Sequence, residues 1–219
     1  MFFFRFVRAK IQTIWWFIYR PLIRIIPFLR PIYLTAKNQS PITFSMWFWQ
    51  KVIGINRDAY WPVHRTSKIN GWRNIYVGID AAPGISPNCY IQAIGKIYLD
   101  DYVQIAPNVS LISSNHFLFD IRKHIVESIR IGKYCSIGTH SVILPGVILG
   151  DFTYVSAGSV VKHSFPDGYC VIGGNPAKKI MSFPEDQKEK FIQWKNKHEY
   201  NGYIPKDKFE KFRKKYLNV

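Results

Sequence analysis

Acidic side chains are scarce in this chain of 219 residues, which has 14 aspartates and glutamates against 30 lysines and arginines. The formal net charge is therefore +16, and a surplus of this size predicts an anionic partner: a phosphate-bearing cofactor, a nucleic acid or an acidic membrane surface. Charge alone does not choose among these partners. The length favours one domain with attached arms, because a chain of this size can bury one good-sized core.

Cysteine is scarce as well. The three cysteines, Cys89, Cys135 and Cys170, are widely spaced and do not have the spacing of metal ligands. Three are too few for a disulfide framework, which favours a reducing cytoplasm as the compartment. Free cysteine is among the most buried residue types, so we expect each of the three to be a small core residue and not a nucleophile.

Long apolar runs are missing from the N-terminal segment. Residues 1–34 mix aromatic and branched apolar residues with six lysines and arginines. Their longest charge-free stretch, residues 11–19, is less than half of the about 20 residues that a spanning helix needs. No small-residue cleavage site follows Tyr19, which argues against a secretory signal.

Residues 1–40 are therefore interpreted as a basic amphipathic arm. Its aromatic residues would lie at headgroup depth in a membrane interface, with its arginines on lipid phosphates. Pro21, Pro27 and Pro31 would divide it into short pieces. In the alternative, residues 1–34 pack on the body or on a neighbouring subunit, where burying so many arginines would be costly.

A strict repeat of six residues runs through the second half of the chain. Its first place is apolar in every repeat: Ile131, Ile137, Ile143, Leu149, Val155 and Val161. Its fifth place is small or branched: Cys135, Ser141, Val147, Thr153 and Ser159. The same two rows continue upstream, and weaken at Ala93 and Pro87: Ile91, Ile97, Leu99, Val103, Ile105, Val109 and Leu111.

A period of six fits neither a helix nor a simple hairpin meander. Self-similarity at a short fixed period indicates a solenoid, in which stacked coils bury the apolar rows. Each hexad would form one flat face with a turn at its corner, and glycine in the second place, at Gly132, Gly138 and Gly150, suits a corner that needs positive φ. An ordinary β-sandwich would have to keep five consecutive hexads in phase by chance.

The repeat is also recognisable as a sequence. "IGKYCSIGTHSVILPGVILGDFTYVSAGSVV" at 131–161 resembles the hexapeptide-repeat acyltransferases, and "GGNPAKKI" at 173–180 is similar to the motif that follows the last coil in many of them. The similarity covers residues 75–180, which we take as the catalytic domain. It implies an all-β core: a left-handed parallel β-helix of triangular section, three hexads to a coil, that assembles as a homotrimer with an active site in each cleft between subunits.

The repeat is interrupted at one place. Leu111 and Ile131 are twenty residues apart, which is not a multiple of six, so the loop 113–129 must leave the stack. Loops that leave a rigid scaffold are where binding and chemistry are usually placed. In the sugar O-acetyltransferases that the chain resembles, a histidine at the start of this loop is the general base, which implies that role for His116.

The second ring nitrogen of His116 then needs a partner. Asp120, Glu127 or a backbone carbonyl could supply it; Asp120 is included with His116 as a catalytic residue, although the sequence does not decide among the three. Asn115 and His124, in the same loop, are expected on the substrate side.

The resemblance also implies acetyl-CoA as the acetyl donor. Five residues are assigned to it: Gly138, Ala157, Gly158, Lys162 and Lys178. Backbone amides near the first three would bind the pantetheine arm, and one of them could stabilise the tetrahedral oxyanion. Lys178 stands where relatives often have a basic residue near the nucleotide phosphate, and Lys162 follows the last repeat. Relatives often have Thr-Lys where this chain has Lys162 and His163, a departure from the family pattern.

Residues 41–74 are rich in tryptophan and out of phase with the repeat. We expect them to cap the open N-terminal end of the β-helix, because an uncovered β edge invites unwanted pairing. In the alternative, Trp47, Trp49 and Trp61 stack on sugar rings.

Residues 181–219 are interpreted as a basic helical tail. Phe191 and Trp194 have helical spacing among lysines, and such a charge run is usually a solvated face. The tail could also contact a membrane beside the arm.

The function that these features predict is acetyl transfer from acetyl-CoA to a hydroxyl of a sugar, in surface polysaccharide or lipid-linked saccharide biosynthesis, at the cytoplasmic inner face of a membrane. Serine, amino-sugar and chloramphenicol-type acetylation use the same scaffold, and a non-catalytic β-helical scaffold is the alternative from another class. A carbonic-anhydrase-like zinc site would need three histidines on adjacent coils, and His116 and His140 have no third in phase, so no metal is expected. Nucleic-acid binding is not expected, because the basic residues cluster in the arms.

Overall fold

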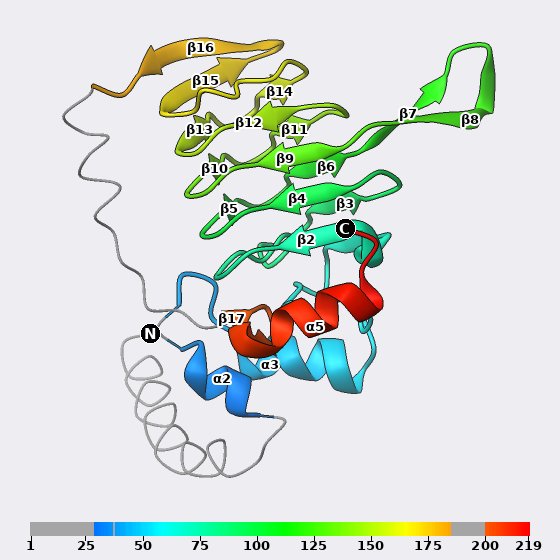
Figure 1. Cartoon of the computed structure of the whole chain (residues 1–219), viewed down its shortest axis with the longest axis vertical. Coiled ribbons are helices and arrows are strands. Elements are labelled where there is room, and N and C mark those ends of the chain that lie inside the picture. Colours follow the sequence, from blue (N-terminus) through cyan, green and yellow to red (C-terminus); the bar gives the residue numbers. More distant parts are fainter. Residues whose placement is uncertain (1–28, 37, 185–199) are drawn as a thin grey trace, which may run out of the picture.

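The computed structural model describes residues 29–36, 38–184 and 200–219, and places most of them in a parallel β-helix with helices at one end (Figure 1). The predictions for residues 1–28 of the arm, and for Phe191 and Trp194 of the tail, lie outside the described residues. Within the described ranges, no helix is long and apolar enough to cross a membrane.

Three sheets form the walls of the β-helix. The β1 sheet has the strand order β1-β3-β6-β11-β14, the β2 sheet β2-β4-β9-β12, and the β5 sheet β5-β10-β13-β15-β16. The strands of the β1 sheet are β1 Lys68–Asn70, β3 Tyr90–Gln92, β6 Ser110–Ile112, β11 Val142–Ile143 and β14 Val160–Val161. Those of the β2 sheet are β2 Ile75–Val77, β4 Ile97–Leu99, β9 Ile129–Ile131 and β12 Ile148–Leu149. Those of the β5 sheet are β5 Gln104–Ile105, β10 Ser136–Ile137, β13 Thr153–Val155, β15 Cys170–Gly174 and β16 Ala177–Ser182.

The pairing register explains the period of six. Ile143 of β11 lies beside Val161 of β14, the first place of the hexad three repeats later, so that one coil takes three hexads. The first-place and fifth-place rows point inward and are buried, the three cysteines among them, as the sequence predicted. Upstream, Ile69 pairs with Ile91, and the chain between them is longer than three hexads. The first coil is therefore enlarged, which is why the repeat weakens there.

The second-place glycines have a different role from the one expected. The φ angles of Gly132, Gly138 and Gly150 lie outside the left-handed region. Positive φ falls two residues later in each hexad, at Tyr134, His140, Gly146, Phe152 and Gly158. What the second place requires is close backbone approach, because a Cβ on Gly150 would lie 2.1 Å from the carbonyl oxygen of Pro166 in the next turn.

The turns between the sheets stack into three edges. The amide edge, with turns 138–141 and 156–159, joins the β5 sheet to the β1 sheet. The loop edge, with turns 113–128, 144–147 and 162–165, joins the β1 sheet to the β2 sheet. The aromatic edge joins the β2 sheet to the β5 sheet. Its rings form one stack, with 4.9, 4.8 and 5.0 Å between successive centroids, in the order Tyr102, Tyr134, Phe152 and Tyr169.

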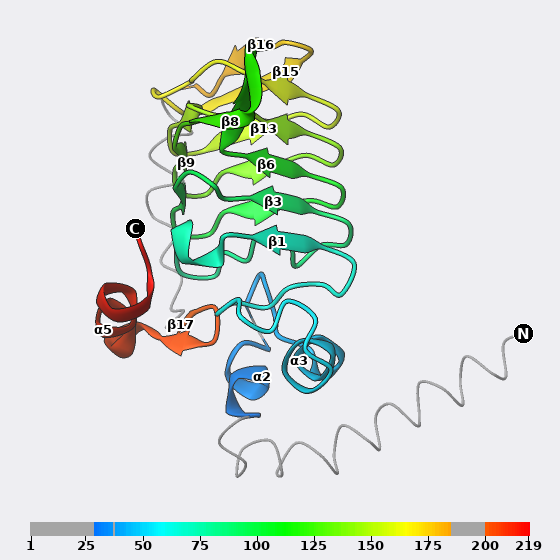
Figure 2. The ribbon, with the colours of Figure 1, turned by 90° about the vertical axis from the view of Figure 1, so that its right-hand side faces the viewer.

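Helices cover the N-terminal end of the β-helix (Figures 1 and 2). They are α2 Arg30–Leu34, α3 Phe44–Trp47, the π-helix η1 Phe48–Val52 and, from the far end of the sequence, α5 Lys206–Tyr216. Strand β1 begins at Lys68, inside the segment assigned to the cap, and pairs in parallel with β3. Trp61 is fully buried and donates its Nε1 hydrogen to the carbonyl oxygen of Pro83 at 2.8 Å. Trp61 is thus a core residue, and the alternative that it stacks on a sugar ring is wrong.

Candidate active site

The interruption of the repeat forms a β-hairpin that projects from the loop edge (Figure 1). Strands β7 Ser114–Phe117 and β8 Asp120–Val126 pair antiparallel, and the chain re-enters the stack at β9. Ser113 fixes the base of the hairpin: its hydroxyl donates to the Gln92 carbonyl at 2.8 Å and accepts from the Gly95 amide at 2.9 Å. These hydrogen bonds fix the base of the hairpin to the preceding coil of the β-helix.

His116 lies in the middle of β7, opposite His124 of β8. The two exposed rings have their centroids 4.6 Å apart. Nδ1 of His116 lies 2.6 Å from the carbonyl oxygen of Ile121. A carbonyl only accepts, so in the neutral imidazole Nδ1 carries the hydrogen and Nε2 is the basic nitrogen. Of the three partners that the sequence left open, the structure selects a backbone carbonyl.

Asp120 is engaged elsewhere, which corrects its assignment as the group that orients His116. Its carboxylate accepts from Nε of Arg122 at 2.9 Å and from the Arg122 amide at 3.2 Å, and Nζ of Lys123 is 3.8 Å away. The hydrogen bonds from Arg122 hold the pKa of the Asp120 carboxyl below its usual range. The carboxylate is satisfied at the hairpin turn because the sequence places two cations close behind it.

Glu127, the third of those partners, points along the loop edge. A Cβ built on Gly146, in the next coil, would lie 3.2 Å from Oε1 of Glu127. Asn115, expected on the substrate side, is exposed on β7 opposite Ile125.

The amides assigned to the thioester arm lie at the amide edge, and two of the three are used by the scaffold. The Gly138 amide donates to the Val155 carbonyl at 2.8 Å, and the Gly158 amide donates to the Thr139 carbonyl at 2.8 Å. Ala157, exposed between these turns, has an N–H with no acceptor among the residues that the structure describes. Gly158 has φ +71°, and a Cβ there would meet no atom within 4 Å, so the space in front of this turn is open.

The two assigned lysines lie at different edges. Lys178 is exposed on β16, opposite Gly173 of β15. The amide of the following residue, Gly174, donates to the hydroxyl of Ser159 in the amide edge at 3.3 Å. This places Lys178 above the amide edge. Lys162 and His163 are exposed in the turn after β14, at the loop edge. His116 and Ala157 likewise belong to different edges of one chain, with strands β11 and β14 of the β1 sheet between them.

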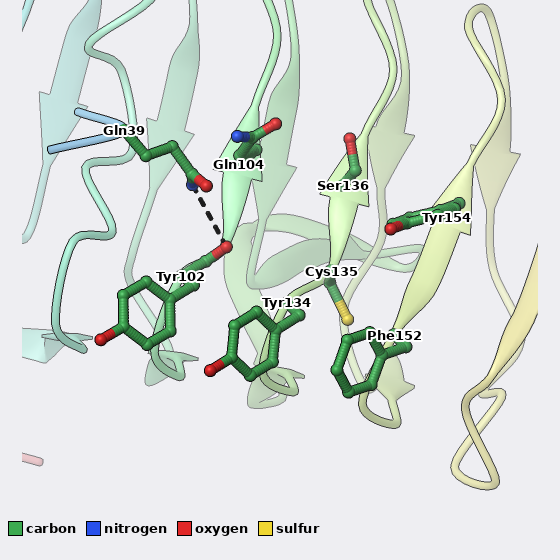
Figure 3. Close-up of a pocket in the computed structure, with 8 residues that line it drawn as sticks. All are labelled: Gln39, Tyr102, Gln104, Tyr134, Cys135, Ser136, Phe152 and Tyr154. Carbon is green, nitrogen blue, oxygen red and sulfur yellow. Dashed lines mark hydrogen bonds between the residues drawn. The ribbon is translucent and has the colours of Figure 1, made fainter. Parts of the chain in front are cut away.

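A pocket on the β5 sheet was missed by the sequence analysis. It has a volume of about 230 Å³, and outward residues of three strands face it from one side and the aromatic edge from the other (Figure 3). Its lining is Gln39, Tyr102, Gln104, Tyr134, Cys135, Ser136, Phe152 and Tyr154. The only signal in the sequence was the recurrence of aromatic residues at Tyr134 and Phe152, which hold the same place in hexads one full coil apart. No group of three or more histidine, cysteine or acidic side chains that could hold a metal ion occurs in the described part of the chain.

The comparisons with known proteins agree with this architecture. A family model described as bacterial transferase hexapeptide (six repeats) matches residues 124–163. The galactoside O-acetyltransferase of Escherichia coli K12 is 34% identical over 101 residues, which are 44% of this chain and 49% of that protein. WbbJ of Escherichia coli K12, a candidate lipopolysaccharide biosynthesis O-acetyl transferase, is 29% identical over 166 residues, 75% of this chain and 82% of WbbJ.

Among solved structures, a galactoside acetyltransferase in complex with coenzyme A superimposes with a TM-score of 0.55 and 27% identity over 77% of this chain and 84% of that one. The chain spans about half the length of the first curated relatives that it matches. The phased hexads, the sheet register, the family model and this superposition agree with one another. In its repeat region the chain is similar to the hexapeptide-repeat acetyltransferases.

Proposed function

We propose that the protein transfers an acetyl group from acetyl-CoA to a hydroxyl of a sugar, with His116 as the general base. The observation that carries the proposal is the contact between Nδ1 of His116 and the carbonyl oxygen of Ile121, at 2.6 Å. It fixes the tautomer and the ring orientation in which Nε2 can take a proton, on a hairpin that a hexapeptide scaffold holds in place.

The proposed chemistry uses His116 twice. Nε2 takes the proton of the acceptor hydroxyl as its oxygen bonds to the thioester carbonyl carbon. The resulting imidazolium is stabilised by its Nδ1–H···O=C bond to Ile121. When the carbon–sulfur bond breaks, the same Nε2 returns the proton to the departing thiolate, so the histidine ends in its starting state.

The amide edge fits the donor in two respects. The Ala157 amide is a donor not used by the scaffold, placed at an open turn, and it suits either the pantetheine arm or the oxyanion that forms at the thioester carbon. Lys178, exposed above the same edge, suits a phosphate group. Acetyl-CoA, when bound, supplies the activated acyl group; the chain's own groups position it.

The distribution of these residues supports a site shared between copies of the chain. His116 projects from the loop edge and Ala157 lies at the amide edge, so one copy does not bring them together. In a closed ring of identical subunits, the loop edge of one copy meets the amide edge of the next, and every cleft is then complete. We therefore propose a left-handed β-helix in a homotrimer with three such clefts. Lys162, at the loop edge, would enter the cleft with His116.

The acceptor class is proposed from the relatives. The galactoside O-acetyltransferase acts by its name on a sugar, and WbbJ is named for lipopolysaccharide biosynthesis. A saccharide of a surface polysaccharide or its lipid-linked precursor is the acceptor that we propose. His124 and Asn115, which flank the base on the hairpin, would contact it.

The test is thiol release from acetyl-CoA with a panel of sugars, serine and chloramphenicol as acceptors. For His116→Ala we expect a loss of about 10²- to 10⁴-fold in kcat with a sugar acceptor, the range typical of a general base. His64→Ala, a histidine that precedes β1 at the N-terminal end of the β-helix, is the matched control and should leave kcat unchanged. Asp120→Asn should retain kcat within about threefold, because Ile121 and not Asp120 holds the ring. A fully active His116→Ala protein would refute the assignment, and turnover of serine or chloramphenicol alone would refute the acceptor class.

A further inference from the structure

The helical cap carries an exposed apolar surface that the β-helix does not use. We define this cap face by Phe44, Phe48, Val52, Ile53 and Ile55. Their exposed fractions are 53%, 37%, 51%, 51% and 36%. Phe44, Phe48 and Val52 recur every four residues along α3 and η1, and in the π-turn the Ile53 amide bonds to the Phe48 carbonyl at 3.1 Å. Phe44, Phe48 and Val52 therefore lie on one side of a short continuous helix, and Ile53 and Ile55 follow directly after its last residue.

The opposite side of this helix is anchored, so the cap face cannot turn inward. Gln50 is fully buried, and its Nε2 donates to the carbonyl oxygen of Trp61 at 2.8 Å. Its Oε1 accepts from the Tyr203 hydroxyl at 2.7 Å. These bonds tie η1 to the core and to the C-terminal segment. The outward direction of Phe44 and Phe48, whose rings stack at 6.3 Å, is thus built into the fold.

Cations lie at the same end of the molecule as the cap face. Arg57 and Arg65 are exposed beside it, and the guanidinium of Arg65 lies 5.1 Å from the centre of the Trp49 ring. Helix α5 lies at the same end of the molecule (Figure 2). Its exposed lysines are Lys206, Lys208, Lys211, Lys214 and Lys215. Apolar side chains that share one end of a molecule with lysines and arginines match the headgroup and phosphate layers of an anionic bilayer.

The arm leaves the described structure at this same end. Leu29 and Ile32 pack with Ile42 in a small cluster that Trp47 of α3 joins, so the chain continues from the cap into residues 1–28. That segment has five basic and no acidic residues. A second copy of the cap, or the arm itself, would bring further positive charge to a positive surface, whereas an anionic lipid surface is complementary to both.

We propose that the cap face is a docking surface for anionic lipid bilayers. Phe44, Phe48 and the branched residues enter the headgroup boundary, while the lysines of α5 and the flanking arginines contact lipid phosphates. The coils of the β-helix then extend from the cap away from the membrane surface. This proposal concerns the cap alone and is independent of the acetyl transfer proposed above.

A site-specific probe in the full-length protein tests the proposal. Phe48→Cys is labelled with a polarity-sensitive fluorophore, and the three native cysteines, all buried, do not compete. Ile180→Cys is the matched control, since Ile180 is 62% exposed on β16 at the opposite end. Vesicles contain phosphatidylcholine alone or with phosphatidylglycerol. We expect a several-fold rise in emission at position 48 with anionic vesicles, none at position 180, and a much weaker rise with neutral vesicles.

Other outcomes would overturn the proposal. Vesicles that bind the protein while position 48 stays silent would show that the arm binds without the cap face. A probe that is already shielded without lipid would show that the arm or a second copy covers the face. As a second measurement, the double variant Phe44→Ser, Phe48→Ser should bind anionic vesicles at least about tenfold more weakly in sedimentation, with Ile180→Ser as control. Unchanged affinity would refute the proposal.

Discussion

Tyr60 packs at the end of the β2 sheet, and removal of its hydroxyl should lower the stability of that end of the fold. The hydroxyl donates to the Ile75 carbonyl at 3.1 Å and accepts from the Val77 amide at 2.8 Å. Both partners belong to β2, the outermost strand of that sheet among the described residues, whose free edge has no further strand to pair with. Tyr60 is 5% exposed, and burial raises the pKa of its hydroxyl, so the neutral group is the one that binds.

The substitution Tyr60→Phe keeps the ring, which packs on Trp61 and Phe212, and removes only the hydroxyl. Two buried hydrogen bonds are lost and two backbone groups are left without a partner, for a cost of about 2 to 3 kcal/mol. For a chain of this size that corresponds to a fall in Tm of roughly 5 to 10 °C. Thermal unfolding at one protein concentration measures it, and hydrogen exchange at the Val77 amide should accelerate.

Tyr216→Phe is the matched control, because Tyr216 on α5 is 44% exposed, and its Tm should not move. If Tyr60→Phe melts within about 1 °C of the wild type, the edge of β2 does not depend on this hydroxyl and the reasoning about the cap is refuted.

Local contacts elsewhere in the molecule give three further predictions. In a denaturant titration, Gly168→Ala should lower the free energy of unfolding by more than about 2 kcal/mol, because φ is +65° and the new Cβ would lie 2.1 Å from the Asp151 carbonyl oxygen. Gly158→Ala, at φ +71° but with no atom near the new Cβ, should lower it by only about 1 kcal/mol. Cys135, whose pKa burial raises to about 12, should react with a disulfide reagent at pH 8 only after unfolding; a fast reaction in the native protein would contradict its burial. Burial lowers the pKa of the Lys51 ammonium from 10.5 to about 8, so between these pH values the unfolded chain binds more protons than the folded one. The free energy of unfolding of the wild type, measured relative to Lys51→Met, should therefore rise from pH 8 to 10. A difference that does not change with pH would refute this.

The second half of the fold could be predicted from the sequence because one physical rule governs it. Each coil takes three hexads, so an apolar residue every six positions both fills the interior and fixes the register, as Ile143 beside Val161 shows. Upstream, Ile69 and Ile91 are neighbours across a coil that is longer than three hexads. A longer turn changes the number of residues between successive inward-facing positions, although those positions still stack in the same rows. A search for a fixed period of six then does not detect them.

The residue types of the candidate site could be predicted from the sequence, but the hydrogen-bond partners of those residues could not. The break in phase identified the loop with His116, but the partner of its Nδ1 is a main-chain carbonyl, which every residue has and which no sequence pattern marks. Asp120 was the natural candidate by charge, and it is satisfied instead by Arg122, two residues away, because a local pair forms at little entropic cost. The glycines at Gly132 and Gly150 were located correctly, but they serve close packing and not positive φ.

Complementation between two inactive variants tests most directly that His116 of one copy and the amide edge of another form the acetyl-transfer site. His116→Ala lacks the base, and Ala157→Glu places bulk and negative charge at the exposed turn without disturbing the core. Each alone should be inactive in thiol release from acetyl-CoA with a sugar acceptor. Co-expressed with different tags and purified together, they should recover roughly a quarter of the wild-type rate, the share of intact clefts when subunits assort at random into trimers. A mixture that assembles and stays as inactive as either variant alone would contradict the shared site.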